Sequence, residues 1–218
     1  MEETKKKGLN TSSNSYTIIY SVVIVVLVAF LLAFVSSTLK PQQDENVALD
    51  KKKQILAALN IRDIDGAEAT EQYNKVVTAD MIINRDGTTI AKGEQGGTKT
   101  GFLCNSASTK EGKLALYVCN VDGQTKYVIP VYGMGLWGGI SGYIALNADK
   151  QTVYGAYFNH EGETAGLGAE IKDSRTWQAQ FKGKHLFAAG KEGVALSVVK
   201  KNEVSDPTTQ CDAVTGAT

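Results

Sequence analysis

The chain has 218 residues, of which 43% are apolar and 21% are charged, a balance typical of a folded protein and not of a disordered one. Its 23 Lys and Arg residues equal its 23 Asp and Glu residues, so no net positive charge favours nucleic acid or an anionic surface as a partner. Three cysteines without a Cys-x-x-Cys pair and only two histidines argue against a zinc site or an iron–sulfur cluster, so any redox role would need an organic cofactor.

Residues 16–39 contain no charged side chain and are mostly apolar. A helix of about 20 such residues crosses the hydrocarbon core of a bilayer. The alternative is a cleaved signal peptide ending near Ser36-Ser37-Thr38, but the apolar part of a signal peptide is usually only about 7–15 residues long. The sequence therefore predicts a retained transmembrane helix at 16–39.

Basic residues lie on both sides of this segment, at Lys5–Lys7 before it and at Lys40 and Lys51–Lys53 after it, so charge alone does not set its orientation. Short N-terminal tails before a first span usually remain in the cytoplasm. We therefore expect residues 1–15 to be a cytoplasmic tail and the chain after the span to face the outer side of the membrane. Residues 40–66 are expected to form a helix or stalk leading from the membrane.

Residues 67–218 predict one α+β domain of antiparallel hairpins with packed helices. The expected elements are a helix at 67–78, a strand at 81–84, a hairpin of 114–121 with 125–131, a second hairpin of 142–147 with 152–158, a helix between an N-cap at Asp173 or Ser174 and Gly183, and a strand at 194–199. The Asp122-Gly123 pair is a strong hairpin signal because both positions tolerate positive φ. No Gly-x-Gly-x-x-Gly opens a helix, which argues against a doubly wound dinucleotide-binding fold.

Two glycine-rich segments are candidates for a binding site. Residues 160–170 contain three glycines, which leave backbone N–H groups free to face a phosphate or a flat ring, and Thr164 adds a hydroxyl donor. Residues 132–139 place Leu136 and Trp137 among four glycines, an apolar surface suited to a flavin ring. The alternatives are a surface loop that binds nothing and a core tryptophan at a strand entrance.

The chain ends in Asp212-Ala213-Val214-Thr215-Gly216-Ala217-Thr218. Small residues leave this backbone open to a bulky reagent, Gly216 lets the chain turn, and a threonine hydroxyl can carry a phosphate ester. The segment therefore predicts an attachment site for a phosphate-bearing group. The alternative is a small-residue turn without a function.

Hydrolytic chemistry is not predicted. No serine or cysteine nucleophile is arranged with His160 or His185, and the spacing of the glutamates within 161–170 does not define a catalytic carboxylate pair. Cys104 and Cys119 have two open interpretations, a disulfide in an oxidising compartment or buried free thiols.

Four features, taken in order along nearly the whole chain, resemble the C subunits of the bacterial sodium-translocating NADH:quinone oxidoreductase, the Nqr complex. They are the N-terminal span, Gly135-Leu136-Trp137-Gly138-Gly139-Ile140-Ser141-Gly142-Tyr143-Ile144-Ala145-Leu146, Glu163-Thr164-Ala165-Gly166-Leu167-Gly168-Ala169-Glu170, and Thr215-Gly216-Ala217-Thr218. The resemblance implies one FMN per chain, joined by a phosphoester to Thr218 and installed from FAD by a flavin transferase.

The resemblance further implies a domain on the periplasmic side of the inner membrane. Its FMN would relay single electrons between an iron–sulfur centre and a covalent FMN on a neighbouring subunit, so the chain would be a relay without catalytic residues of its own. The implied cofactor-binding residues are Thr218 itself, its neighbours Asp212, Thr215, Gly216 and Ala217, the loop residues Glu163, Thr164, Gly166, Leu167 and Gly168, and the pair Leu136 and Trp137.

The chain departs from the family pattern in two places. Ala165 stands where relatives usually carry proline, which frees φ and restores an N–H, and relatives usually run on past the modified threonine. Two alternatives remain open at this point. One is the covalent-FMN G subunit of an Rnf-type ferredoxin:NAD oxidoreductase, which Leu136-Trp137 favours less than the quinone-reducing complex. The other is a membrane-anchored binding domain without a redox role.

Overall fold

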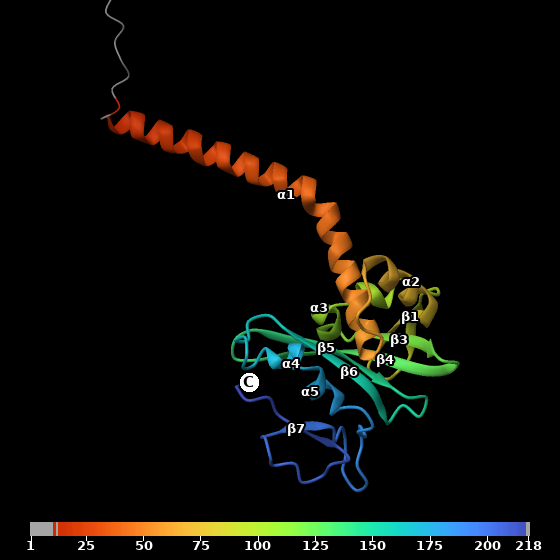
Figure 1. The fold of residues 1–218 in the computed structure, drawn as a ribbon. Coiled ribbons are helices and arrows are strands. Elements are labelled where there is room, and N and C mark those ends of the chain that lie inside the picture. The colour runs from red at the N-terminus through yellow and green to blue at the C-terminus, as the bar shows by residue number, and fades with distance from the viewer. Residues whose placement is uncertain (1–10, 12, 217–218) are drawn as a thin grey trace, which may run out of the picture. The chain divides into compact units, whose positions relative to one another are not determined.

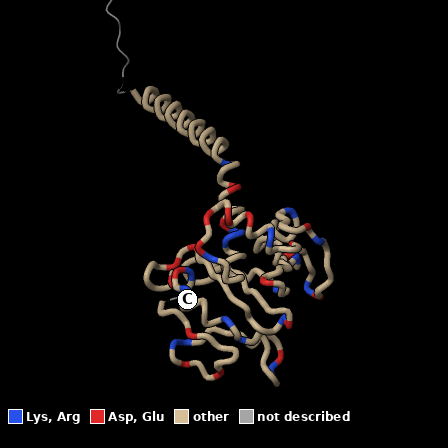
Figure 2. Tube along the Cα trace, turned by 45° about the vertical axis from the view of Figure 1, so that its right-hand side comes forward, with Lys and Arg blue, Asp and Glu red and all other residues tan. Residues whose placement is uncertain are grey.

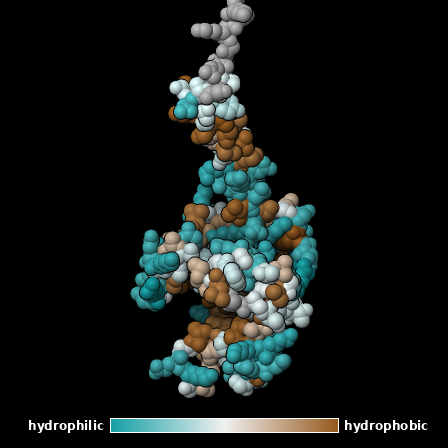
Figure 3. Space-filling view, turned by 90° about the vertical axis from the view of Figure 1, so that its left-hand side faces the viewer, coloured by the Kyte–Doolittle hydropathy of each residue, from teal (hydrophilic) through white to brown (hydrophobic). Residues whose placement is uncertain are grey.

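The computed structural model describes residues 11 and 13–216 (Figure 1). The chain divides into two compact units, residues 1–48 and 49–218. The first unit contains most of helix α1, Asn14–Ala58, which includes the predicted span at 16–39. The helix is long and apolar enough to cross a membrane. Its large apolar side chains are exposed on the helix surface (Figure 3), and charged residues appear along it only after the apolar segment (Figure 2). These features fit the predicted anchor.

The second unit is built on a six-stranded antiparallel sheet in the order β2-β1-β3-β4-β5-β6. Its elements in chain order are α2 (Gly66–Val76), β1 (Val77–Ile83), β2 (Thr89–Lys92), the 3-10 turn η1 (Gly101–Leu103), α3 (Ser106–Lys110), β3 (Leu114–Val121), β4 (Gln124–Met134), β5 (Gly139–Leu146), β6 (Val153–His160), α4 (Glu170–Asp173), α5 (Arg175–Ala179), β7 (Ser197–Val199) and β8 (Gln210–Asp212). Strands β7 and β8 pair in parallel as a separate small sheet. The α+β prediction is confirmed.

Apolar side chains lie on both faces of the large sheet. On one face a buried cluster joins the strands to α5 and β8; it consists of Ile144, Leu146, Val153, Ala156, Phe181 and Cys211. On the other face the paired residues Tyr117, Val128 and Ala145 are buried. The end of α1 packs on this second face, where a Cβ on Gly155 would lie only 2.5 Å from the Ala58 carbonyl oxygen.

The free edge of β6 is covered by the segment that follows α1. The Asn60 amide donates to the Tyr154 carbonyl (3.0 Å), and the Arg62 guanidinium donates to the Ala156 carbonyl (3.1 Å). Arg62 also donates to the Gln178 side chain (2.8 Å), which links this segment to the region of α5. Satisfied edge carbonyls make β6 a poor template for pairing with another chain.

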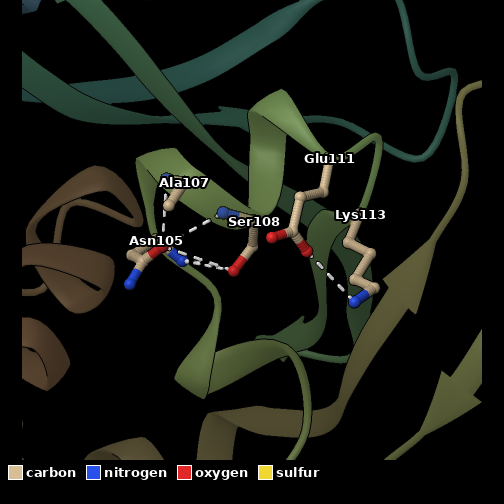
Figure 4. A network of polar contacts seen from close by, with 5 residues as sticks. All are labelled: Asn105, Ala107, Ser108, Glu111 and Lys113. Atoms are coloured by element: carbon tan, nitrogen blue, oxygen red, sulfur yellow. Dashed lines mark hydrogen bonds and ion pairs between the residues drawn. The ribbon is translucent and has the colours of Figure 1, made fainter.

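Helix α3 has only five residues, and its N-terminus depends on a capping box (Figure 4). The Asn105 side chain accepts from the backbone N–H groups of Ala107 (3.0 Å) and Ser108 (3.1 Å). Just beyond the helix, Lys113 pairs with Glu111 at 3.2 Å. The cap satisfies donors that so short a helix leaves without partners.

Both predicted hairpins are confirmed, and Asp122 and Gly123 have positive φ (51° and 78°). Other boundaries were wrong. The helix predicted at 67–78 ends at Val76 because the chain pairs with β3 from Val77 on, so β1 begins four residues before the predicted 81–84. The predicted helix to Gly183 ends at Ala179, and the strand expected at 194–199 is limited to the residues that pair with β8.

The three cysteines are free and buried. Cys104 and Cys119 are therefore buried thiols and do not form the alternative disulfide. Burial raises the pKa of the Cys119 thiol to about 12, and burial also raises the pKa values of Cys104 and Cys211. A thiol that stays protonated and inaccessible is a poor nucleophile.

We therefore expect that no cysteine of the native full chain reacts quickly with an aromatic disulfide reagent at pH 8. All three should react after unfolding in guanidinium without a reductant. Rapid labelling of the native protein, or a single reactive thiol after unfolding, would contradict this assignment.

The end of α1 should be essential to the second unit, because Leu56 is fully buried there. We expect Leu56→Ala to lower the free energy of unfolding by about 2–5 kcal/mol, the usual cost of such a cavity. Urea unfolding of the full chain in detergent measures the change. Val47→Ala, at an exposed position of the same helix, is the control and should have little effect.

Candidate functional site

The two glycine-rich loops lie at the same end of strands β4, β5 and β6 of the large sheet. Met134 at the end of β4 pairs with Gly139 at the start of β5, and Ile140 pairs with His160 at the end of β6. Because neighbouring strands are antiparallel, the turn 135–138 and the loop that follows β6 leave the sheet on the same side. The topology thus brings both predicted segments together.

These two loops are in direct contact. The Gly139 N–H donates to the Glu161 carboxylate (3.0 Å), and a Cβ on Gly162 would lie only 2.1 Å from the Trp137 carbonyl oxygen. Only a glycine at position 162 permits this approach. Glu161 therefore has a structural role, which its position in a glycine-rich segment did not reveal.

The loop also touches the C-terminal segment. A Cβ on Gly168 would meet the Glu163 carboxylate at 2.0 Å and the Gly216 carbonyl oxygen at 3.0 Å, and a Cβ on Gly216 would meet the Leu167 Cβ at 3.1 Å. Gly216 has φ of 79°, a conformation that disfavours other residues. The loop 163–168 thus packs against the Thr-Gly-Ala-Thr segment, about fifty residues later in the sequence.

Large apolar side chains are exposed in these loops. Leu136 is 78% exposed, Trp137 is 67% exposed and Leu167 is 48% exposed. Trp137 is therefore not the core residue of the alternative interpretation. We call Leu136, Trp137 and Leu167 the apolar platform.

The remaining predicted site residues lie in the loop after β6, in the C-terminal segment or outside the described residues. Thr164 is exposed in the loop, and its carbonyl accepts from the N–H groups of Leu167 and Ala169, both at 3.1 Å. Thr215 is exposed beside Gly216, and Asp212 ends β8. Ala217 and Thr218 lie outside the described residues.

Two cavities adjoin the C-terminal segment. One, of about 340 Å³, lies beside Thr215 and is lined by Gly166, Glu170, Ser174, Thr176, Trp177, Gln180, Lys201 and Asp212–Thr215. The other, of about 570 Å³, is mostly apolar and lies between β4–β6, α5 and β7. Trp177, Ala213 and Val214 line both cavities. Trp177 lies within the helix predicted to end at Gly183, and its proximity to the C-terminal segment was not predicted.

Comparison with known proteins identifies this arrangement. Residues 135–218, which contain the turn 135–138, the loop 160–170 and the C-terminal segment, match the model of the FMN-binding domain. The chain is 33% identical over 195 residues, covering 83% of its length and 74% of the relative, to the C subunit of the Na(+)-translocating NADH-quinone reductase of Haemophilus ducreyi. It is 29% identical over 230 residues, 96% of this chain and 87% of the relative, to the same subunit of Pseudomonas aeruginosa.

The crystal structure of the C subunit of the Na(+)-translocating NADH-quinone reductase from Parabacteroides distasonis has the same fold, with a TM-score of 0.73, at 34% identity over 82% of this chain and 85% of that one. The chain belongs to this family of C subunits, the NqrC family. The expected family is therefore confirmed, and the FMN-binding domain of this NqrC homologue includes both glycine-rich loops and the C-terminal segment.

The residues present fit a flavin. Glycines at 162 and 168 allow close backbone approach between segments that a Cβ would separate, and the apolar platform offers aromatic and aliphatic surface beside them. A flavin ring needs such apolar contact, and protein groups around it tune its redox properties. The fit depends on the contact between the loops.

Substitution of Gly162 should disturb that contact. In this NqrC homologue we expect Gly162→Ala to speed amide hydrogen exchange in both 135–139 and 161–168 and to cost about 1–3 kcal/mol, as overpacking usually does. Gly133→Ala is the matched control, since a Cβ there meets nothing within 4 Å. Unchanged exchange in Gly162→Ala would show that the two loops are not coupled.

Proposed function

We propose that the chain is a membrane-anchored flavoprotein subunit of a Na(+)-translocating NADH-quinone reductase, carrying one FMN joined by a phosphoester to Thr218. The observation that carries the proposal is the packing of loop 163–168 against Gly216 of the Thr-Gly-Ala-Thr segment. This contact joins a glycine-rich loop to the segment that bears the acceptor hydroxyl.

The proposed attachment uses FAD as the donor and a flavin transferase as the catalyst. The Thr218 hydroxyl oxygen forms a bond to the phosphorus of the FMN half, the bond from that phosphorus to the AMP oxygen breaks, and AMP leaves. The hydroxyl proton is released. An ester removes the dissociation equilibrium of the cofactor, which matters on the periplasmic side because lost FMN would not return.

The bound FMN would supply the capacity to accept and pass on single electrons. This chain's residues would hold the ring and exclude water from one side of it. Leu136, Trp137 and Leu167 of the apolar platform are exposed apolar side chains that a flat ring would cover. The Glu163 N–H donates to His160 (3.2 Å) and the Leu167 N–H donates to the Thr164 carbonyl (3.1 Å), so internal bonds shape the loop.

The site residues Asp212, Thr215, Gly216, Ala217, Glu163, Thr164, Gly166 and Gly168 would surround the ester and the ribityl chain. Helix α1 would keep the protein in the inner membrane, with residues 1–15 in the cytoplasm, 16–39 in the bilayer, 40–66 leading out of it and 67–218 in the periplasm. The protein would assemble with other Nqr subunits. It would relay electrons between an iron–sulfur centre and a covalent FMN on a neighbouring subunit.

Paired threonine variants test the acceptor. The full chain is expressed with a flavin transferase and examined by denaturing electrophoresis under ultraviolet light and by intact mass. We expect a fluorescent band in the wild type that disappears in Thr218→Ala and persists in Thr215→Ala. A band lost only in Thr215→Ala would move the ester to Thr215. An unmodified wild-type mass would contradict the covalent flavoprotein.

A further inference from the structure

Strand β8 ends at Asp212, just before the Thr-Gly-Ala-Thr segment, which we call the acceptor segment. Hydrogen bonds hold Asp212 from both sides. We propose that Trp177 and Gln180 are positioning residues that clamp Asp212 and so fix where the acceptor segment leaves the fold. The effect on bound flavin rests on the proposed function, whereas the clamp on the strand does not.

On one side, two side chains take the place of a neighbouring strand. The Trp177 indole Nε1–H donates to the Asp212 carbonyl oxygen at 2.6 Å, and the Asp212 N–H donates to the Gln180 side-chain oxygen at 3.0 Å. Trp177 and Gln180 are three residues apart, a spacing that puts them on one side of a helical turn. The donor and the acceptor of one residue are thus both satisfied by side chains.

On the other side, Asp212 pairs with Val199 of β7. The Ala213 N–H donates to the Val199 carbonyl at 2.7 Å, and the Asn202 N–H donates to the Asp212 carboxylate at 2.8 Å. Four hydrogen bonds therefore converge on two adjacent residues. They hold the chain just before the Thr-Gly-Ala-Thr segment.

The indole itself is fixed by its surroundings. Its ring lies 5.5 Å from the ring of Phe158 and 5.3 Å from that of Phe181, measured between centroids. The Trp177 backbone N–H donates to the Ser174 hydroxyl at 3.2 Å, which caps α5. A side chain already packed in one orientation loses little entropy when its N–H holds a strand.

The clamp limits where FMN can go. Thr218 follows Ala213 by five residues, so its Cα stays within about 18 Å of the Ala213 Cα even when the chain is extended. Between them, Gly216 rests against Leu167. A fixed Asp212 directs the segment across the loop 163–168, and a released Asp212 would let the segment and its flavin move away from the apolar platform.

Hydrogen exchange of the unmodified full chain in detergent tests the clamp directly. Trp177→Phe keeps an aromatic ring against Phe158 and Phe181 but removes the donor. We expect exchange at Asp212 and Ala213 to become about threefold to tenfold faster, the effect of losing one hydrogen bond. Gln180→Ala should do the same. Unchanged exchange in both variants would overturn the proposal.

The matched control is Trp137→Phe, at the chain's only other tryptophan. Trp137 belongs to the apolar platform and takes no part in the four hydrogen bonds that hold Asp212 and Ala213, so exchange at these two residues should stay at the wild-type rate. Equal acceleration in Trp137→Phe would show a general loosening and would also overturn the proposal.

In the flavinylated protein, quenching of the flavin fluorescence by iodide reports on the exposure of the flavin, which a loss of stability alone would not change while the protein is folded. At a temperature where every variant is folded by circular dichroism, iodide should quench the flavin of Trp177→Phe at least about twofold more strongly than that of the wild type, since the weakened clamp frees the segment. Equal quenching would refute the positioning role. Absence of flavin from the wild type would instead refute the proposed function, and the exchange experiment would still decide the clamp.

Discussion

The constraint on which the second unit depends is that its large sheet is apolar on both faces. Such a sheet is stable only when both faces are shielded from water. The end of α1 and α2 shield the face of Tyr117 and Val128, whereas α5 and the C-terminal strand shield the face of Ile144. The C-terminal strand is therefore part of the core and not an appendage, since Cys211 within it is buried in the same cluster as Ile144.

This need for a second cover also explains the place of the proposed cofactor. Strand β8 closes the core beside α5. The chain that follows β8 therefore leaves the core near the ends of β4, β5 and β6, where the two glycine-rich loops lie. The chain then passes from Asp212, held by α5 and β7, to Gly216, held by the loop 163–168. The proposed FMN site is thus assembled from the loops at one end of β4–β6 and a terminal segment whose course the core dictates.

The sequence predicted the parts that depend on local chemistry. The charge-free run at 16–39 is a local signal that predicted the long apolar helix. The Asp122-Gly123 turn is another, and it predicted an antiparallel hairpin. The sequence placed β7 only within a longer strand at 194–199 and did not predict β8, because three-residue strands are defined by their partner and not by their own pattern. The resemblance implied that the loop 163–168, Trp137 and the Thr-Gly-Ala-Thr segment serve one flavin. The close approach of Gly162 to Trp137 and of Gly168 to Gly216 was not predicted, since spacing in the sequence carries no information on such contacts.

Helix α1 has a consequence for how the domain can be separated from its anchor. Ile55, Leu56 and Leu59, at and just after the end of the helix that carries the apolar segment, are fully or almost fully buried in the second unit. Proteolysis between Lys40 and Ala48 would release a fragment that keeps its core, whereas cleavage in the turn at Asn60 would strip one sheet face. A fragment that keeps the core of the second unit therefore begins within helix α1, ahead of the loop that follows the helix.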